Sequence, residues 1–157
     1  MKEEDKKLLL KDLIARLPYG VKIALKNNGS YHHDNVAKKG DITIDKLKGF
    51  TGSYFTIYHN NPLDWDWYDD DIDIEDIKPY LFPLSSMTAE QEEELKNIYY
   101  SYNGMFQYAE RIFDKIPFSK MKYFPYQIEE FFNRNHFDYR GLIKKGLAID
   151  STNKNIY

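Results

Sequence analysis

The sequence contains no cysteine, which excludes a disulfide bond, a cysteine-ligated zinc site and a thiol nucleophile. It also has little uninterrupted apolar sequence near its start, where only Leu8-Leu9-Leu10 forms a run. A membrane span needs about 20 apolar residues, and a signal peptide also needs a longer run than this. We therefore expect neither of them, and we expect a cytoplasmic protein in a bacterial host.

The motifs that identify common enzyme classes are missing as well. The sequence has no HExxH pair, no GxSxG elbow, no phosphate-binding loop and no GxGxxG fingerprint. Adjacent histidines on a strand, such as His32 and His33, point to opposite faces and chelate a metal poorly. We therefore expect no enzyme activity, no cofactor and no metal site. A metal-dependent hydrolase built on histidines and aspartates is the second alternative.

The chain is rich in carboxylates within one short segment. Residues 51–110 carry 2 basic and 13 acidic side chains, whereas residues 1–50 carry 11 and 7 and residues 111–157 carry 9 and 5. A surface of one charge sign steers encounters with oppositely charged partners, so the segment predicts a docking surface. The residues expected to contact a partner are Trp65, Asp66, Trp67, Asp69, Asp70, Asp71, Asp73 and Glu75.

A calcium-binding loop does not explain this acidic segment. When an EF-hand loop is started at Asp64, Asp69 occupies the position that requires glycine for a sharp turn. When the loop is started at Asp69, Tyr80 occupies the position of the bidentate glutamate. The simpler alternatives are a solvated acidic face and the protection of a strand edge.

The C-terminal third offers an alternative interaction surface, because basic and aromatic residues alternate there. Stacking rings with nearby cations would suit RNA or single-stranded DNA. The residues of this alternative are Lys120, Lys122, Tyr123, Arg134, Arg140, Lys144 and Lys145. No known nucleic-acid motif accompanies them, and the sequence pI near 5.8 argues against constitutive binding.

Periodicity predicts the elements of the N-terminal half. Leu9, Leu13 and Leu17 form one stripe of a helix over residues 3–16, with Asp12 placed away from the stripe. Alternation over residues 21–26 predicts a strand with one buried face. Shorter strands are expected at 41–45 and 53–58, after a turn at 27–30.

The second half begins with a strand expected at 71–75, where isoleucines alternate with acids. Pro79 and Pro83 then indicate an extended connector from the sheet to the helices. Thr88 and Gln91 match a capping box, which predicts the start of a long helix over residues 89–115. A further helix is expected over 125–135, and one more short helix in the tail, 136–149.

These elements predict one α+β domain over residues 1–157. It would consist of a helix at 1–17, a sheet half at 21–80 and a helical half at 88–150. The sheet half is expected to form a small antiparallel β-meander or a partial barrel.

Three segments carry a resemblance to a known group: Leu17-Pro-Tyr-Gly-Val-Lys22, Asp76 to Thr88, and His136 to Ile149. The chain resembles small proteins encoded by prophages and mobile elements of anaerobic Gram-negative bacteria. The resemblance carries over no catalytic residue, and it implies an accessory protein of a phage or mobile element. Such proteins often act stoichiometrically on host or defence machinery, including as anti-CRISPR inhibitors.

Together these observations predict a non-enzymatic protein-interaction module. It would dock its acidic surface onto a basic groove of a protein partner that handles nucleic acid, for example a nucleoprotein effector. No membrane partner is expected, direct nucleic-acid contact is the first alternative, and the oligomeric state is left open.

Overall fold

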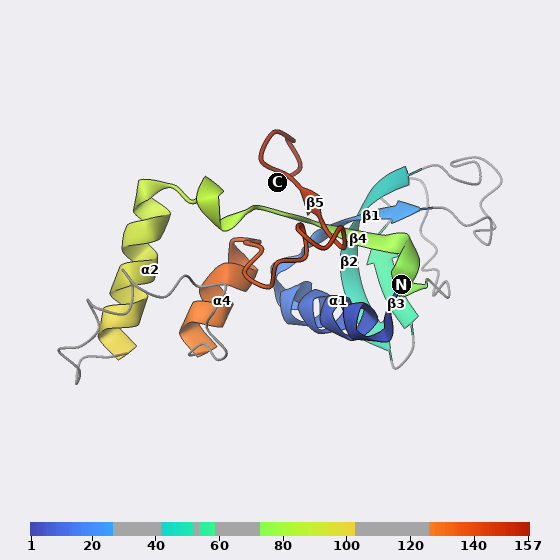
Figure 1. Cartoon of the computed structure of the whole chain (residues 1–157), viewed down its shortest axis with the longest axis horizontal. Helices are drawn as coiled ribbons and strands as arrows, with labels where there is room; N and C mark the ends of the chain where they lie inside the picture. Colours follow the sequence, from blue (N-terminus) through green and yellow to red (C-terminus); the bar gives the residue numbers. More distant parts are fainter. Residues whose placement is uncertain (27–41, 52–53, 59–72, 103–125) are drawn as a thin grey trace.

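The computed structural model describes residues 1–26, 42–51, 54–58, 73–102 and 126–157 (Figure 1). Within these residues the chain forms helices and a sheet, which confirms the α+β class. The helices are α1 (Glu3–Arg16), α2 (Ala89–Tyr102) and α4 (Tyr126–Arg134). The strands are β1 (Lys22–Lys26), β2 (Ile42–Thr51), β3 (Tyr54–Tyr58), β4 (Ile77–Leu81) and β5 (Ile149–Asp150).

The sheet has the strand order β3-β2-β1-β4-β5. Strands β1, β2 and β3 form the predicted antiparallel meander, with an irregularity between Leu47 and Gly49 of β2. Strand β4 joins on the other side of β1, also antiparallel, and the short β5 pairs with β4 in parallel. The meander thus accounts for three strands, and the chain then crosses to the far side of β1.

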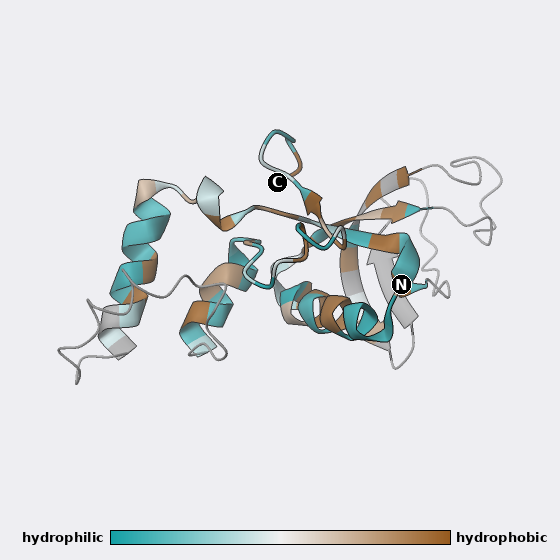
Figure 2. Cartoon of the chain, in the orientation of Figure 1, coloured by the Kyte–Doolittle hydropathy of each residue, from teal (hydrophilic) through white to brown (hydrophobic). Residues whose placement is uncertain are grey.

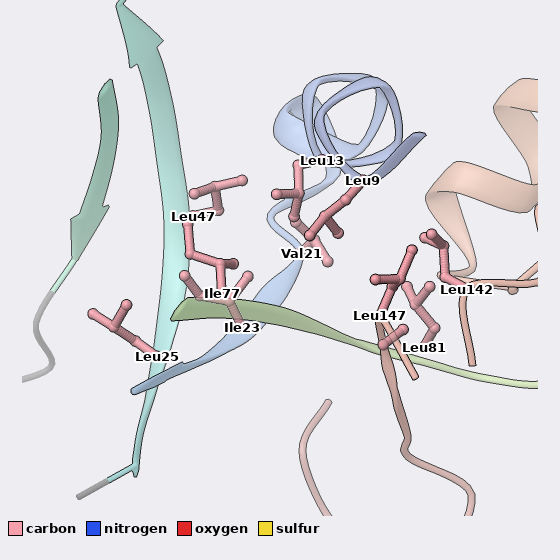
Figure 3. Close-up of a cluster of buried hydrophobic side chains, with 11 residues drawn as sticks. Leu9, Leu13, Val21, Ile23, Leu25, Leu47, Ile77, Leu81, Leu142 and Leu147 are labelled. Carbon is pink, nitrogen blue, oxygen red and sulfur yellow. The ribbon is translucent and has the colours of Figure 1, made fainter. Parts of the chain in front are cut away.

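Helix α1 covers one face of this sheet. Leu9 and Leu13 are fully buried and point toward Ile23, Leu47 and Ile77 of the strands (Figure 3). Each such buried side chain contributes about 1.5–3 kcal/mol by leaving water. We call this cluster the aliphatic core. Its buried members are Leu9, Leu13, Val21, Ile23, Leu25, Leu47, Ile77, Leu81, Leu142, Leu147 and Ala148.

A second core lies between α2 and α4, at the end of the molecule away from the sheet (Figure 1). Helix α4 lies between α2 and α1, and contacts both helices. The phenyl rings of Phe131 and Phe132 meet edge to face, with centroids 5.8 Å apart. We call this cluster the aromatic core. Its buried members are Leu95, Tyr99, Ile128, Phe131, Phe132, Phe137 and Tyr139.

The predicted capping box is present at the start of α2. The backbone N–H of Thr88 donates to Gln91 Oε1 at 2.9 Å, and the backbone N–H of Gln91 donates to Thr88 Oγ1 at 3.3 Å. These bonds satisfy two backbone donors that a helix start otherwise leaves unpaired. The helix is described as far as Tyr102, so the predicted continuation to residue 115 lies outside the described residues.

Two predictions around the acidic segment are wrong. Residues Ile74–Asp76 form a 3-10 turn, not a strand, because the Asp73 side chain accepts the backbone N–H of Glu75 and favours a turn. The stretch expected to be a connector contains β4, an interior strand of the sheet. Pro79 is tolerated there because β5 starts pairing with β4 only at Tyr80, so no bond to β5 is lost.

The tail after α4 forms turns and a short strand where a helix was expected. Asp138 accepts the backbone N–H groups of Leu142 and Ile143 at 2.7 and 2.8 Å, which fixes a turn. The tail also pairs with β4 through β5, and with the residue just after β4 through a parallel bridge between Phe82 and Phe137. Its backbone bonds therefore go to the sheet and to Asp138 instead of to a helix.

Candidate functional site

The described part of the predicted acidic surface is engaged within the chain. Asp73 caps the 3-10 turn, and Glu75 accepts ion pairs from Lys6 Nζ at 2.6 Å and from the amino group of Met1 at 3.1 Å. The hydrogen bond from Lys6 holds the pKa of Glu75 below its usual value. The other predicted contact residues lie outside the described residues; they are Trp65, Asp66, Trp67, Asp69, Asp70 and Asp71.

Helix α2 carries further acidic residues of the same middle segment. Glu90, Glu92 and Glu93 are exposed, and none of them forms an ion pair within the described residues. Figure 2 shows the helix as mostly hydrophilic along its first turns. A shallow, open groove runs along it, lined by Ala89, Glu90, Glu93, Glu94, Asn97, Ile98 and Ser101. This surface escaped the sequence prediction, although the run of glutamates was a signal for it.

The described basic residues of the nucleic-acid alternative are mostly paired with carboxylates. Arg134 bonds to Glu94, Lys145 to Asp5 at 3.0 Å and Arg140 to Asp12 at 2.8 Å. Only Lys144 among them is exposed without an ion pair to a described residue. Lys120, Lys122 and Tyr123 lie outside the described residues, so nucleic-acid binding by this set stays a prediction.

A buried polar junction, formed by Asp12, Arg16 and Arg140, connects the two cores. Arg16 and Asp12 are both fully buried, and Arg16 donates from Nε to Asp12 Oδ2 at 2.7 Å and from Nη2 to Oδ1 at 3.1 Å. Arg140 donates to the same Oδ1 at 2.8 Å. The placement of Asp12 away from the buried stripe is therefore wrong, because its charge is paired inside the protein.

Arg16 also binds the end of α4 and the chain that follows it. Its Nη1 donates to the carbonyl of Phe132 at 3.3 Å, and its Nη2 donates to the carbonyl of Phe137 at 2.8 Å. Carbonyls in the last turn of a helix lack intrahelical partners, and a cation is favoured there. The arrangement satisfies buried charges and carbonyls, so its chemistry is that of a structural clamp between α1 and α4.

His136 lies beside this junction in a strained backbone conformation, with φ of 56°. Its ring stacks on the ring of Tyr157 with centroids 4.2 Å apart, and its Nδ1 has no hydrogen-bond partner within the described residues. Burial, together with nearby Arg16, lowers the pKa of His136 to about 4. The ring is therefore neutral at physiological pH.

The neighbouring carboxylate does not act as the partner of that histidine. Asp138 accepts backbone N–H groups of the tail, and burial raises its pKa above the usual value. Within the described residues no hydrogen bond joins the His136 ring to the Asp138 carboxylate, so the two do not act as a base with an adjacent carboxylate. Nor do any three His, Asp or Glu side chains of the described residues gather closely enough to hold a metal ion.

The three segments that carry the resemblance lie side by side in the structure. Residues 17–22 lead into β1, which pairs with β4 within residues 76–88. The third segment, 136–149, pairs with residues 76–88 through the bridge between Phe137 and Phe82 and through the pairing of Ile149 with Tyr80. The described helices include none long and apolar enough to cross a bilayer.

Comparison with known proteins adds no family to this description. A scan against protein-family models finds no match, and neither does a search of curated proteins or of solved structures. The functional argument therefore depends on the residues and their geometry.

Proposed function

We propose that this chain is a non-enzymatic protein-interaction module of phage or mobile-element origin, acting in the cytoplasm of a bacterial host. Its acidic surface would dock onto a basic groove of a protein that handles nucleic acid, in the manner of an anti-CRISPR inhibitor. The surface consists of the acidic segment, residues 64–76, apart from Glu75, which Lys6 and the amino group of Met1 neutralise, and of Glu90, Glu92 and Glu93 of α2.

The observation that carries the proposal is that Glu90, Glu92 and Glu93 of α2 are exposed and form no ion pair with a described residue, whereas Glu94 pairs with Arg134. Glu90 and Glu93 line the groove beside the apolar side chains of Ala89 and Ile98. Charge at the rim with apolar surface inside it is the usual composition of a protein interface. By contrast, Asp5, Asp12 and Glu75 are acids neutralised by basic groups of the chain itself.

The physical basis is electrostatic complementarity. A groove that binds phosphates carries lysine and arginine, so a row of carboxylates can occupy it. Such charges mainly accelerate association and select the partner, and the apolar groove would supply the remaining affinity. The proposal therefore predicts competition between this chain and nucleic acid for one site on the partner.

The test begins with partners captured from the native host and identified by mass spectrometry. Each purified candidate is loaded with labelled nucleic acid, and displacement by the chain is measured. We expect displacement by the native chain, and weakening by about tenfold or more with Asp69, Asp70, Asp71 and Asp73 changed to Asn, or with Glu90→Gln and Glu93→Gln together.

The control matched to the α2 variant changes Glu3 and Glu4 of α1 to Gln, which removes the same two charges from another exposed part of the chain. We expect this variant to displace nucleic acid as well as the native chain. Equal weakening in all variants would indicate only a net-charge effect. No weakening in any variant would remove the acidic surface as the docking site.

A further inference from the structure

A second exposed surface, opposite in charge to the first, lies on the sheet face away from α1. Ile23 and Leu25 of β1 point into the aliphatic core, so the alternate residues of β1 point to the other face. The register places Ile42 opposite Lys26, Ile44 opposite Ala24, and Lys78 opposite Ala24 on the other side. We call this surface the lysine face; its members are Lys26, Ile42, Ile44, Lys46 and Lys78.

The lysine face combines exposed apolar and basic side chains. Ile42 is 65% exposed and Ile44 is 50% exposed, which are large values for isoleucines within a strand. Lys26, Lys46 and Lys78 are exposed around them, and none forms an ion pair within the described residues. An isoleucine pair surrounded by lysines has the composition of an interface patch with a charged rim.

The arrangement of charges on this face destabilises the folded chain when no partner is bound. Lys46 of β2 lies directly opposite Lys22 of β1, and like charges in this position destabilise a sheet. Lys22 partly escapes the repulsion, because its Nζ bonds to the carbonyl of Ile156 at the margin of the face. Gly20 leaves space for Lys46, since a Cβ at Gly20 would overlap the Lys46 side chain.

We infer that the lysine face binds an acidic protein segment that also carries apolar side chains. Carboxylates would neutralise the lysines, and apolar side chains would cover Ile42 and Ile44. The inference goes beyond the proposed function, because it assigns a different surface and a partner of the opposite charge. Either one can fail without the other.

The other occupants fit less well. Nucleic acid on a sheet is usually held by exposed aromatic rings within the face, but Tyr80 of β4 is only 5% exposed, and the ring of Tyr157, 44% exposed, lies at the margin beside Lys22. Phosphates would also leave the isoleucines uncovered. The same face of a second copy is disfavoured, because a symmetric contact would bring lysines against lysines.

The test is fluorescence anisotropy with a labelled peptide of alternating Glu and Leu residues, which supplies both carboxylates and apolar groups. We expect saturable binding to the full chain, and weaker binding of a polyglutamate peptide of equal length. Changing Lys26 and Lys46 to Gln should weaken the binding by about tenfold, and Ile44→Thr should do so by a similar factor.

The matched control is Lys7→Gln with Lys11→Gln. Both lysines are exposed on α1, so the two substitutions remove the same charge at a site away from the lysine face. Circular dichroism and thermal unfolding verify that each variant is folded. Absence of peptide binding, or equal affinity in all variants, would overturn the inference. Tighter binding of single-stranded oligothymidine at the same lysines would assign the face to nucleic acid and overturn it too. Self-association in analytical ultracentrifugation that Ile44→Thr abolishes would assign the face to a second copy, which also overturns the inference.

Discussion

The two cores of this protein are built from different kinds of side chain. All buried members of the aliphatic core are Leu, Ile, Val or Ala, whereas five of the seven members of the aromatic core are Phe or Tyr. Branched aliphatic side chains suit a helix on a pleated sheet, where they interdigitate. Rings suit the contact of α2 with α4, where a short helix must bury much area from few positions.

Despite this difference, each core contains or contacts residues from the other half of the chain. Leu142 and Leu147, from the tail that follows α4, complete the aliphatic core. Arg16 of α1 in turn binds carbonyls of Phe132 and Phe137 in the aromatic core. The buried polar junction therefore joins two regions of unlike composition, and we expect the two regions to unfold together while it is intact.

Breaking the junction is expected to have the largest effect. Arg16→Met leaves the Asp12 carboxylate buried with Arg140 as its one remaining ion-pair partner among the described residues. Removing one member of a buried pair costs about 3–5 kcal/mol. Urea unfolding should show this loss. Hydrogen exchange measured at increasing urea concentration should show that the amides of β1 and those of α4 lose protection in separate transitions.

The control is Lys11→Met, which makes the same type of change on the exposed face of α1. It should alter the free energy of unfolding by no more than about 0.5 kcal/mol. If Arg16→Met and Lys11→Met have equal effects, the junction does not connect the two cores.

Truncation within each core sharpens the same comparison. Leu13→Ala in the aliphatic core and Phe132→Ala in the aromatic core should each cost about 3 kcal/mol, through lost burial and the cavity left behind. Because Asp12, Arg16 and Arg140 are unchanged in these variants, each substitution should lower the hydrogen-exchange protection of β1 and α4 amides equally. Loss of protection confined to the mutated region would show that the cores are independent.

The pH dependence of stability tests the neutral histidine beside the junction. The folded pKa of His136 is about 4 and its unfolded value is about 6.5, so between these values the unfolded state takes up the proton first. The contribution of the neutral His136 ring to the free energy of unfolding is complete above pH 6.5 and is lost as the pH falls toward 4. Relative to His136→Asn, the native chain should lose up to about 3 kcal/mol over this range.

Asparagine is the suitable replacement because it tolerates the positive φ of this position. The raised pKa of Asp138 changes stability in the opposite direction, but Asp138 is present in both proteins and its contribution cancels in the difference. Urea unfolding at several pH values measures that difference. A difference that stays constant with pH would contradict the buried, neutral state of the ring.

The smallest effect is expected at the start of α2. Thr88→Ala removes the side-chain acceptor of the Gln91 N–H and should cost about 1 kcal/mol. Ser101→Ala, near the other end of the described helix, removes only a bond to the carbonyl of Ile98 and serves as the control. Thermal unfolding of both variants checks that Thr88→Ala is the more destabilising change. A larger loss of stability in Ser101→Ala would place the start of the helix elsewhere.

Local signals were sufficient to predict much of the fold. The leucine spacing of α1 and the capping box at Thr88 depend on contacts within a few residues, and the structure has both. The alternation over residues 21–26 correctly predicted a strand, but Ala24 on its second face is buried as well. The strand at 71–75 failed because the Asp73 side chain competes for a backbone donor. The interior position of β4 was missed because it depends on pairing with β1, which is distant in sequence.

The candidate site was less predictable for a similar reason. Asp12 and Arg16 are spaced as an ordinary exposed helical ion pair, and only the distant Arg140 and the α4 carbonyls make their burial possible. The lysine face also escaped notice, since it requires the register between β1, β2 and β4. Charge counting did identify the acidic middle of the chain, to which the exposed glutamates of α2 belong.

The contacts of Arg16 also set an order of events during synthesis. Its guanidinium bonds to the carbonyl of Phe137, 121 residues further along, and its partner Asp12 receives Arg140 from 128 residues away. While the ribosome is still producing the middle of the chain, the first helix has no place to bury its charges. Stable docking of that helix must therefore wait until the ribosome has translated residues as far as Arg140, and until then its apolar side chains stay exposed.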